Sequence, residues 1–217
     1  MLSLGVAFAL LITLVAACSG PEEKKQKFFN KGKSLYEKGD FVKAGLEFRN
    51  AIQIDPKFAD AHYMLGMVEL KKKNPRRAFG ELSKAVELNP NLQDAQIQLG
   101  NLYMMSRQPE KALEKAETVL KLSNANEDAL LLKTSALLSM KKSPEALALL
   151  QEMQQRGIKR PELFLLLASS HLQNSRLPEA QGILNEGITA NPKSIVLYLT
   201  LADFYSREKK IDEAAAT

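Results

Sequence analysis

The stretch ADAHYMLGMVELKKKNPRRAFGELSKAVELNPNL, residues 59–92, decides the fold of this chain because it is one copy of a repeat. Outward from its second half, an alanine returns every 34 residues, at Ala44, Ala78, Ala112, Ala146, Ala180 and Ala214. The interval never changes, so no insertion separates one copy from the next. A fixed period of this length is typical of a solenoid, in which each repeat packs on its neighbours and function resides on exposed surfaces.

Each repeat has the pattern of two helices joined by a short turn. In the quoted copy, the first helix is predicted from about Asp60 to Lys72 and the second from Pro75 to Leu88. With the recurrent alanine set at position 20, the repeats begin at residues 25, 59, 93, 127, 161 and 195. Position 8 is also small in every repeat, so we expect positions 8 and 20 to face each other where the paired helices approach closely. The residues at position 8 are Gly32, Gly66, Gly100, Thr134, Ala168 and Ala202.

The first repeat carries a set of residues with a familiar spacing: Phe28, Gly32, Leu35, Gly39, Phe41, Ala44, Phe48, Ala51 and Pro56. This pattern resembles the tetratricopeptide repeat, and the resemblance extends from Lys25 to the end of the chain. It implies an all-α fold over residues 25–217, a right-handed α-solenoid of about six 34-residue helix-turn-helix units. The sixth unit is truncated at Thr217, so we expect further repeats in a longer parent protein.

The first 17 residues are uncharged and mostly apolar, and they precede Cys18, the only cysteine. This run is shorter than the roughly 20 residues that a membrane-spanning helix needs, which favours a removable signal. The segment LVAAC, residues 14–18, resembles the lipobox of bacterial lipoproteins. That resemblance implies a signal peptide at 1–17, acylation of Cys18 and a polar tether over residues 18–24, with a non-lipidated secretory peptide as the alternative. It also implies an outer-membrane anchor that faces the periplasm.

The sequence offers few groups for catalysis or metal binding. His62 and His171 are the only histidines, and they lie more than three repeats apart, so neither can help the other hold a metal ion. No glycine-rich phosphate loop, histidine–cysteine cluster or nucleophile elbow is present. We therefore expect no enzyme activity, no cofactor and no small-molecule substrate.

The charges form two patterns within a mild formal net charge of +5. Basic residues gather at the turn inside each repeat, and acids recur in the first turn of each first helix. Both patterns suit the helix dipole, and the alternative is an electrostatic partner face. Nucleic acid is not expected, since no aromatic residues alternate with the basic ones. The predicted basic edge comprises Lys72, Arg76, Arg77, Lys141 and Lys142.

In tetratricopeptide domains the first helix of each repeat lines the concave surface, mostly with positions 2, 5, 6, 9, 12 and 13. By this resemblance, aromatic or aliphatic side chains at position 5 replace the lysine of the family's carboxylate clamp, which argues against the clamp's ligand, a chaperone C-terminus. Methionines add adaptable apolar surface. The alternative is that these side chains pack against one another. The predicted partner-binding groove comprises Phe29, Tyr63, Met67, Ile97, Asn101, Met104, Leu131 and Leu165.

We therefore expect a lipid-anchored scaffold that binds other proteins through this groove and the membrane through Cys18. A lipobox followed at once by repeats resembles the tetratricopeptide lipoproteins of the PEP-CTERM/exosortase system, which implies a role in exopolysaccharide-linked protein sorting. Type IV pilus pilotins and outer-membrane assembly lipoproteins are alternatives of the same class. A different class is an enzyme whose catalytic domain lies beyond Thr217, with these repeats as its substrate-recruiting arm.

Overall fold

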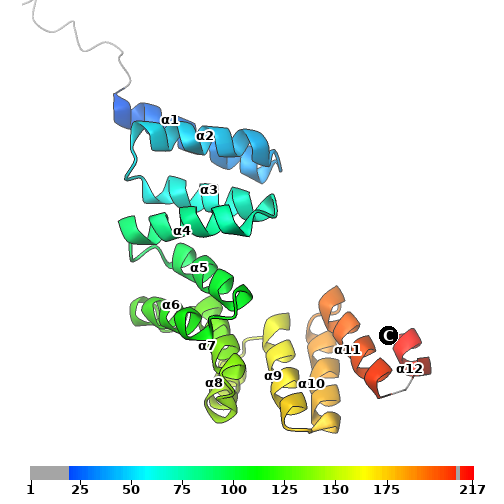
Figure 1. Ribbon diagram of the computed structural model, residues 1–217. Coiled ribbons are helices and arrows are strands. Elements are labelled where there is room, and N and C mark those ends of the chain that lie inside the picture. The colour runs from blue at the N-terminus through cyan, green and yellow to red at the C-terminus, as the bar shows by residue number, and fades with distance from the viewer. Residues whose placement is uncertain (1–19, 209–210) are drawn as a thin grey trace, which may run out of the picture. The chain divides into compact units, whose positions relative to one another are not determined.

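The computed structural model describes residues 20–208 and 211–217, and in that part of the chain every regular element is a helix (Figure 1). The helices are α1 (Pro21–Glu37), α2 (Phe41–Ile54), α3 (Ala59–Lys71), α4 (Pro75–Leu88), α5 (Gln93–Met105), α6 (Pro109–Leu122), α7 (Glu127–Ser139), α8 (Ser143–Gln155), α9 (Pro161–Gln173), α10 (Leu177–Ala190), α11 (Ile195–Arg207) and α12 (Ile211–Ala216). Odd-numbered helices are the first helices of the repeats, and even-numbered helices are the second.

The repeat boundaries follow the predicted register. Helices α3, α5, α7, α9 and α11 begin at the residues that the alanine register gave as repeat starts. The first repeat differs, because α1 begins at Pro21, in the segment predicted to be a tether. Lys25 is already buried there, and its ammonium group lies 2.8 Å from Asp55 and 2.7 Å from Glu22. The tether over residues 18–24 is therefore corrected at its carboxyl end: residues 21–24 form the first turn of α1.

The predicted signal peptide and Cys18 lie outside the described residues. Within residues 20–208 and 211–217, no helix combines the length and the apolar character that crossing a bilayer requires. The anchor therefore stays a prediction from the sequence.

The chain divides into two compact units, which we describe separately. The N-terminal unit ends at Leu88, and in it α1 packs on α2, α2 on α3 and α3 on α4. The C-terminal unit runs from Asn89 to Thr217, and each of its helices packs on the next. Its first helices also contact one another directly, α5 with α7, α7 with α9 and α9 with α11. A row of adjacent first helices is the feature that creates a continuous surface in this unit.

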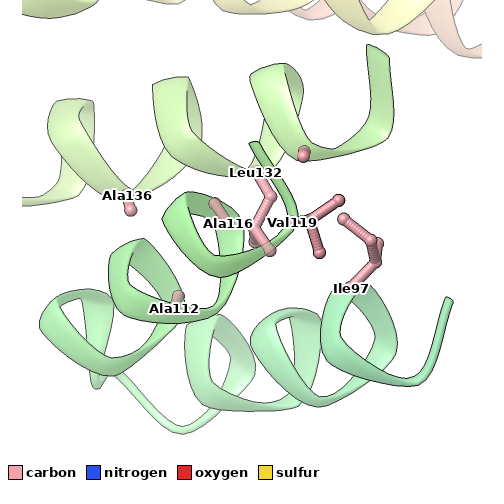
Figure 2. Close-up of a cluster of buried hydrophobic side chains, with 7 residues drawn as sticks. Ile97, Ala112, Ala116, Val119, Leu132 and Ala136 are labelled. Atoms are coloured by element: carbon pink, nitrogen blue, oxygen red, sulfur yellow. The ribbon is translucent and has the colours of Figure 1, made fainter. Parts of the chain in front are cut away.

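Small residues form the centre of each repeat. The position 20 alanines from Ala44 to Ala180 are completely buried, as the period predicted. Figure 2 shows one of the resulting clusters, in which Ala112, Ala116 and Val119 of α6 are grouped with Ile97 of α5 and Leu132 and Ala136 of α7. This cluster therefore combines side chains from two successive repeats, as expected for a core that is built between neighbours.

The close contact at position 8 has a different partner from the predicted one. A Cβ added to Gly66 would lie 2.8 Å from Cγ of Leu82, which is at position 24 of the same repeat. In the first repeat, a Cβ at Gly32 would meet the ring of Phe48, also at position 24. The expectation that position 8 faces position 20 is therefore wrong. Glycine at position 8 makes room for a large side chain, and the alanine at position 20 is packed elsewhere in the core.

The turn inside a repeat has one backbone conformation in the first five repeats. The residue at position 15 has a positive φ, a region that favours glycine. Its N–H and the next one donate to carbonyl groups of the last helical turn, for example Lys141 to Leu138 (3.0 Å) and Lys142 to Leu137 (2.9 Å). These bonds satisfy carbonyl groups that a helix end otherwise leaves unpaired. The position 15 residues are Gly39 (φ 79°), Lys73 (59°), Arg107 (56°), Lys141 (59°) and Ser175 (57°).

The second helix of the fourth repeat is not followed by a proline, unlike the second helices of the first, second and fifth repeats, and it ends differently. Gly157 has a φ of 76°, its N–H donates to Gln154 O, and the N–H of Ile158 donates to Met153 O. Ile158 also packs on the cluster that contains the buried Met153, which is the hydrophobic contact that accompanies this type of helix end. A glycine turn therefore takes the place of the usual proline turn.

Candidate functional site

A cavity of about 380 Å³ opens on the row of first helices in the C-terminal unit. Helices α5, α7 and α9 supply its walls, and the lining residues occupy repeat positions 2, 5, 6 and 9 together with the residue that precedes α9. Four of the predicted groove residues meet here: Ile97, Asn101, Leu131 and Leu165. The other lining residues are Asp128, Leu132, Ser135, Arg160, Glu162 and Leu166.

The floor of the cavity is apolar and largely buried. Ile97 and Leu131, at position 5, are only 6% and 7% exposed. Ile97 packs against Ala129 and Leu132 of the next repeat, and Leu131 against Leu163 of the repeat after that. These two residues therefore belong mainly to the contact between successive first helices, and they form the floor of the cavity.

The accessible walls come from other positions. Leu165 and Leu166 of α9 are half-buried, so part of their apolar surface faces the cavity. Asn101 of α5 is exposed, and Ser135 of α7 is half-buried with its hydroxyl donating to the carbonyl of Leu131 (2.9 Å). The cavity thus offers a limited apolar surface with two neutral polar groups at position 9.

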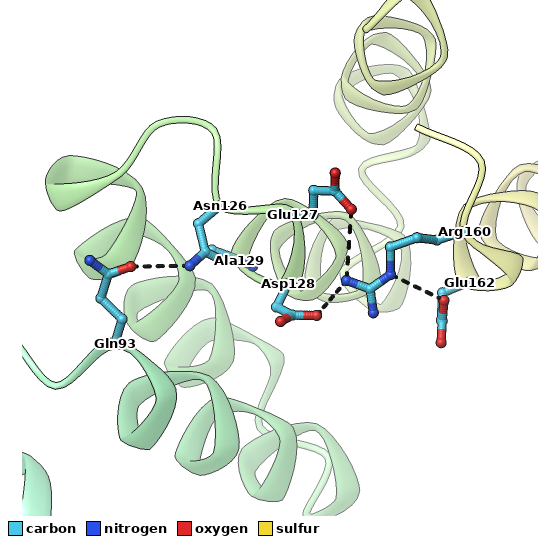
Figure 3. Close-up of polar contacts among 7 residues, drawn as sticks. All are labelled: Gln93, Asn126, Glu127, Asp128, Ala129, Arg160 and Glu162. Carbon is cyan, nitrogen blue, oxygen red and sulfur yellow. Dashed lines mark hydrogen bonds and ion pairs between the residues drawn. The ribbon is translucent and has the colours of Figure 1, made fainter. Parts of the chain in front are cut away.

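Charged side chains gather at one edge of the cavity, around Arg160 (Figure 3). Its Nη1 lies 2.6 Å from Asp128 and 4.0 Å from Glu127, and its Nε lies 3.4 Å from Glu162. Partial burial lowers the pKa of Arg160, but the hydrogen bond to Asp128 and the three carboxylates outweigh this and raise it. The guanidinium group therefore stays charged and ties the start of α7 to the start of α9.

Helix capping explains why polar and acidic side chains gather at the starts of α7 and α9. Asn126 caps α7 by accepting a hydrogen bond from the N–H of Ala129 (2.9 Å), and its amide donates to Gln93 of α5 (3.1 Å). Asp128 lies in the first turn of α7 and Glu162 in the first turn of α9. Carboxylates are favourable at these positive helix ends. The sequence therefore fixes an acidic row along one edge of the first helices in the C-terminal unit.

The remaining predicted groove residues do not line this cavity. Phe29, Tyr63 and Met67 are half-buried residues of the N-terminal unit. The ring of Phe29 packs against Phe58 with centroids 4.8 Å apart, so it contributes to the core of that unit. Met104 is half-buried against the cluster between α5, α6 and α7. The alternative from the sequence, mutual packing, accounts for Phe29 and Met104.

The predicted basic edge is exposed at all five of its residues. Lys72 lies 3.6 Å from Glu69, and Lys142 lies 3.8 Å from Glu145, so two of the five are paired within their own repeats. Lys72, Arg76 and Arg77 belong to the N-terminal unit, whereas Lys141 and Lys142 belong to the C-terminal unit. Lys72 and Lys141 follow the carboxyl ends of α3 and α7, as the dipole interpretation expects, whereas Arg76 and Arg77 lie in the first turn of α4, where the helix dipole does not favour cations.

His62 has a structural role in the N-terminal unit. The side chain is 9% exposed, with Nδ1 2.8 Å from a carboxylate oxygen of Glu81 and Nε2 3.2 Å from the carbonyl of Pro56. Both neighbours can only accept, so both ring nitrogens must carry a proton for the two bonds to form. The hydrogen bond to Glu81 accordingly raises the pKa of His62, against the opposing effect of burial.

Sequence reasoning missed Arg160 and Ser135 as parts of the site, and it gave the acids at the starts of the first helices only as an alternative partner face. Arg160 precedes α9, so a rule based on positions within the first helix could not include it. A usable signal was present, because the position 2 acids Asp128 and Glu162 recur at one repeat interval, and Arg160 lies two residues before Glu162. Among the described residues, no group of three or more His, Cys, Asp or Glu side chains is placed to hold a metal ion.

Comparison with known proteins supports the tetratricopeptide assignment. The family model described as TPR repeat matches residues 32–73, and the model described as tetratricopeptide repeat matches residues 59–92. No curated relative matches the sequence.

Several solved structures have the same fold. A tetratricopeptide repeat protein from Parabacteroides merdae ATCC 43184 is 20% identical, with a TM-score of 0.74 over 89% of this chain and 77% of its own. PilW, a type IV pilus biogenesis factor, is 16% identical, with a TM-score of 0.72 over 88% of this chain and 90% of its own. The first tetratricopeptide domain of Spaghetti (RPAP3), solved with an HSP90 peptide, is 19% identical, with a TM-score of 0.52 over 55% of this chain and 94% of its own. These likenesses confirm the predicted fold class, an all-α tetratricopeptide-type solenoid.

Proposed function

We propose that this chain is a tetratricopeptide scaffold that binds other proteins, and that the cavity between α5, α7 and α9 is a contact site for a partner. The observation that carries the proposal is the convergence of three first helices on one cavity with apolar walls and polar groups at its edge. Recognition sites commonly combine concavity, apolar lining and a few polar groups. Proteins of this repeat family bind other proteins, as the HSP90 peptide bound to a Spaghetti domain illustrates.

The test fills the cavity without touching its floor. Ser135→Phe places a ring in the cavity, whereas Ser139→Phe places the same ring one turn further along α7, on an exposed residue that does not line it. A photo-crosslinking side chain at exposed Asn101 should form adducts with partners from envelope extracts, and Ser135→Phe should abolish them while Ser139→Phe should not. A crosslinker at exposed Gln151 of α8 is the matched control position. Adducts that form equally at Gln151, or that survive Ser135→Phe, would reject the cavity as the contact site.

We further propose that the scaffold is anchored in the bacterial envelope through acylated Cys18, in the outer membrane and facing the periplasm. The lipobox-like residues 14–18 and the absence of any other cysteine motivate this. Two or more acyl chains on one residue give stable anchoring where a single chain gives only marginal binding. Mass spectrometry of the mature amino terminus should find a lipid-modified Cys18, and Cys18→Ser should release a folded soluble protein. An unmodified Cys18 in the membrane fraction would refute the anchor.

Among envelope scaffolds, we favour the exopolysaccharide-linked sorting role that the lipobox followed by repeats suggested. Pilus assembly is the second candidate, because PilW has this fold along most of both chains. Deletion of the gene separates the two: loss of surface pili with normal secretion of sorted proteins would favour pilus assembly, and the reverse result would favour sorting.

A further inference from the structure

We infer that the cavity between α5, α7 and α9 selects a chain segment in which an aliphatic side chain stands next to a lysine or arginine. The inference rests on the proposed function and adds the chemistry of the ligand.

The size and lining of the cavity fit one or two aliphatic side chains. Its volume of about 380 Å³ lies near the lower end of the range of about 300 to 1,000 Å³ that is typical of ligand sites. Leu165 and Leu166 present apolar surface on one wall, and Leu132 closes the floor at 3% exposure. A side chain that enters exchanges water for these groups, so an aliphatic ligand group is favoured.

The charge at the edge of the cavity selects a cation. Three carboxylates, those of Asp128, Glu127 and Glu162, lie within 4.0 Å of the single guanidinium group of Arg160. One positive charge against three negative charges leaves two net negative charges at the edge (Figure 3). Because Arg160 is already paired with three carboxylates, it is a poor binding partner for a carboxylate of the ligand. A lysine or arginine of the ligand is attracted, and an acidic residue at the same place is repelled.

The exposure of these groups sets the size of the effect. The side chains of Asp128 and Glu162 are 59% and 54% exposed, so solvent and salt screen them. Pairs of exposed charges change an equilibrium by about two- to five-fold each. The edge should therefore set the preference between ligands, while the apolar walls supply most of the affinity.

The test measures binding of three fluorescent hexapeptides, blocked at both ends, to the full purified chain. The first alternates leucine and lysine, the second replaces lysine with glutamate, and the third replaces leucine with serine. The leucine–lysine peptide should bind more tightly than the leucine–glutamate peptide at low salt, by about two- to five-fold or more. The difference should shrink toward unity near 1 M salt, where the screening length falls to about 3 Å. The serine peptide should bind weakly at both salt concentrations.

Two substitutions with opposite expected effects on peptide affinity distinguish an electrostatic role of the edge from a structural role. Asp128→Asn should weaken the leucine–lysine peptide about two- to five-fold, and Arg160→Gln should strengthen it by a similar factor because the edge becomes more negative. If Arg160 acted only as a structural link between α7 and α9, Arg160→Gln would weaken every peptide. The matched control is Asp94→Asn, which removes an exposed acid at the same repeat position in α5, outside the cavity lining, and should change nothing.

The outcomes also distinguish this inference from the proposed function. If the leucine–glutamate peptide binds more tightly, and Ser135→Phe abolishes that binding, the cavity is a contact site and only the inferred charge preference is overturned. If Arg160→Gln weakens the lysine peptide while the helical signal and unfolding midpoint are unchanged, the inference is likewise overturned. If none of the three peptides binds at the cavity, both the inference and this assignment of the contact site fail.

Discussion

Two glycines of α10 provide a test of how rigidly the repeats are packed. Gly182 is exposed, and a Cβ added there would meet nothing within 4 Å. Gly187 is buried, and a Cβ added there would lie 2.8 Å from Cβ and 2.8 Å from Cγ of Phe164 on α9. The two positions lie on one helix and differ in their surroundings, so alanine at each separates helix propensity from packing.

The expected magnitudes follow from these contacts. Alanine is favoured over glycine in a helix interior by about 0.8 to 1.0 kcal/mol, so Gly182→Ala should stabilise the C-terminal unit by about that amount. Gly187→Ala has the same gain in helix propensity, but overpacking against Phe164 offsets it by about 1 to 3 kcal/mol. The Cβ of Phe164 is fixed to the backbone, so no rotation about χ1 relieves the contact, and α9 and α10 must separate. Gly182→Ala should therefore exceed Gly187→Ala in stability by about 1 to 3 kcal/mol.

The assay is urea unfolding followed by the helical signal, together with amide hydrogen exchange along α9 and α10. Hydrogen exchange is needed because repeat arrays can unfold in parts, so a single midpoint can hide a local effect. Phe164→Leu is the informative second-site change: it keeps the Cβ, so it should not relieve Gly187→Ala. Equal stabilisation by both alanines would refute the reasoning, because it would show that α9 and α10 can separate at no cost.

Three further predictions address other parts of the chain. The pKa of His62 is raised in the folded state, so its contribution to stability is complete below its unfolded value of about 6.5 and is lost as pH rises through the folded value. The opening free energy of α3 and α4, obtained from hydrogen exchange corrected for the pH dependence of the intrinsic exchange rate, should therefore fall as pH rises above about 6.5, and His62→Gln, but not His171→Gln, should abolish this fall. Lys141→Gly should stabilise the C-terminal unit by about 1 kcal/mol by relieving the positive φ, measured by urea unfolding, whereas Lys141→Ala, which removes the charge alone, should not. Ala112→Leu should destabilise the same unit by about 1 to 3 kcal/mol in urea unfolding, since Ala112 is completely buried between α5, α6 and α7; an unchanged midpoint would mean that the cluster can expand.

The sequence predicted the fold well because the period directly reports on packing. The 34-residue recurrence located the starts of α3, α5, α7, α9 and α11, and the buried alanines followed. The prediction failed at Pro21, which was assigned to a polar tether but begins α1. Proline and acidic residues are both favourable in a first helical turn, so a proline followed by two acids does not distinguish a tether from the start of a helix. The prediction also failed at Gly66, because a small residue reveals that something approaches but not which side chain does so.

The groove was harder to predict because exposure at position 5 depends on the next repeat. In the C-terminal unit, Leu131 is 7% exposed because α9 packs against α7, whereas Leu165, at the same position in α9, is half-buried with part of its surface in the cavity. The residue type is identical, so no rule based on position and hydrophobicity can separate a ligand-facing leucine from a repeat-facing one. What the sequence does determine is the edge of the groove, because acids at helix starts are favoured wherever the helix lies. Specificity in this groove should therefore be sought in Asp128, Glu162 and Arg160, and the apolar row behind them is chiefly the contact that keeps the first helices in line.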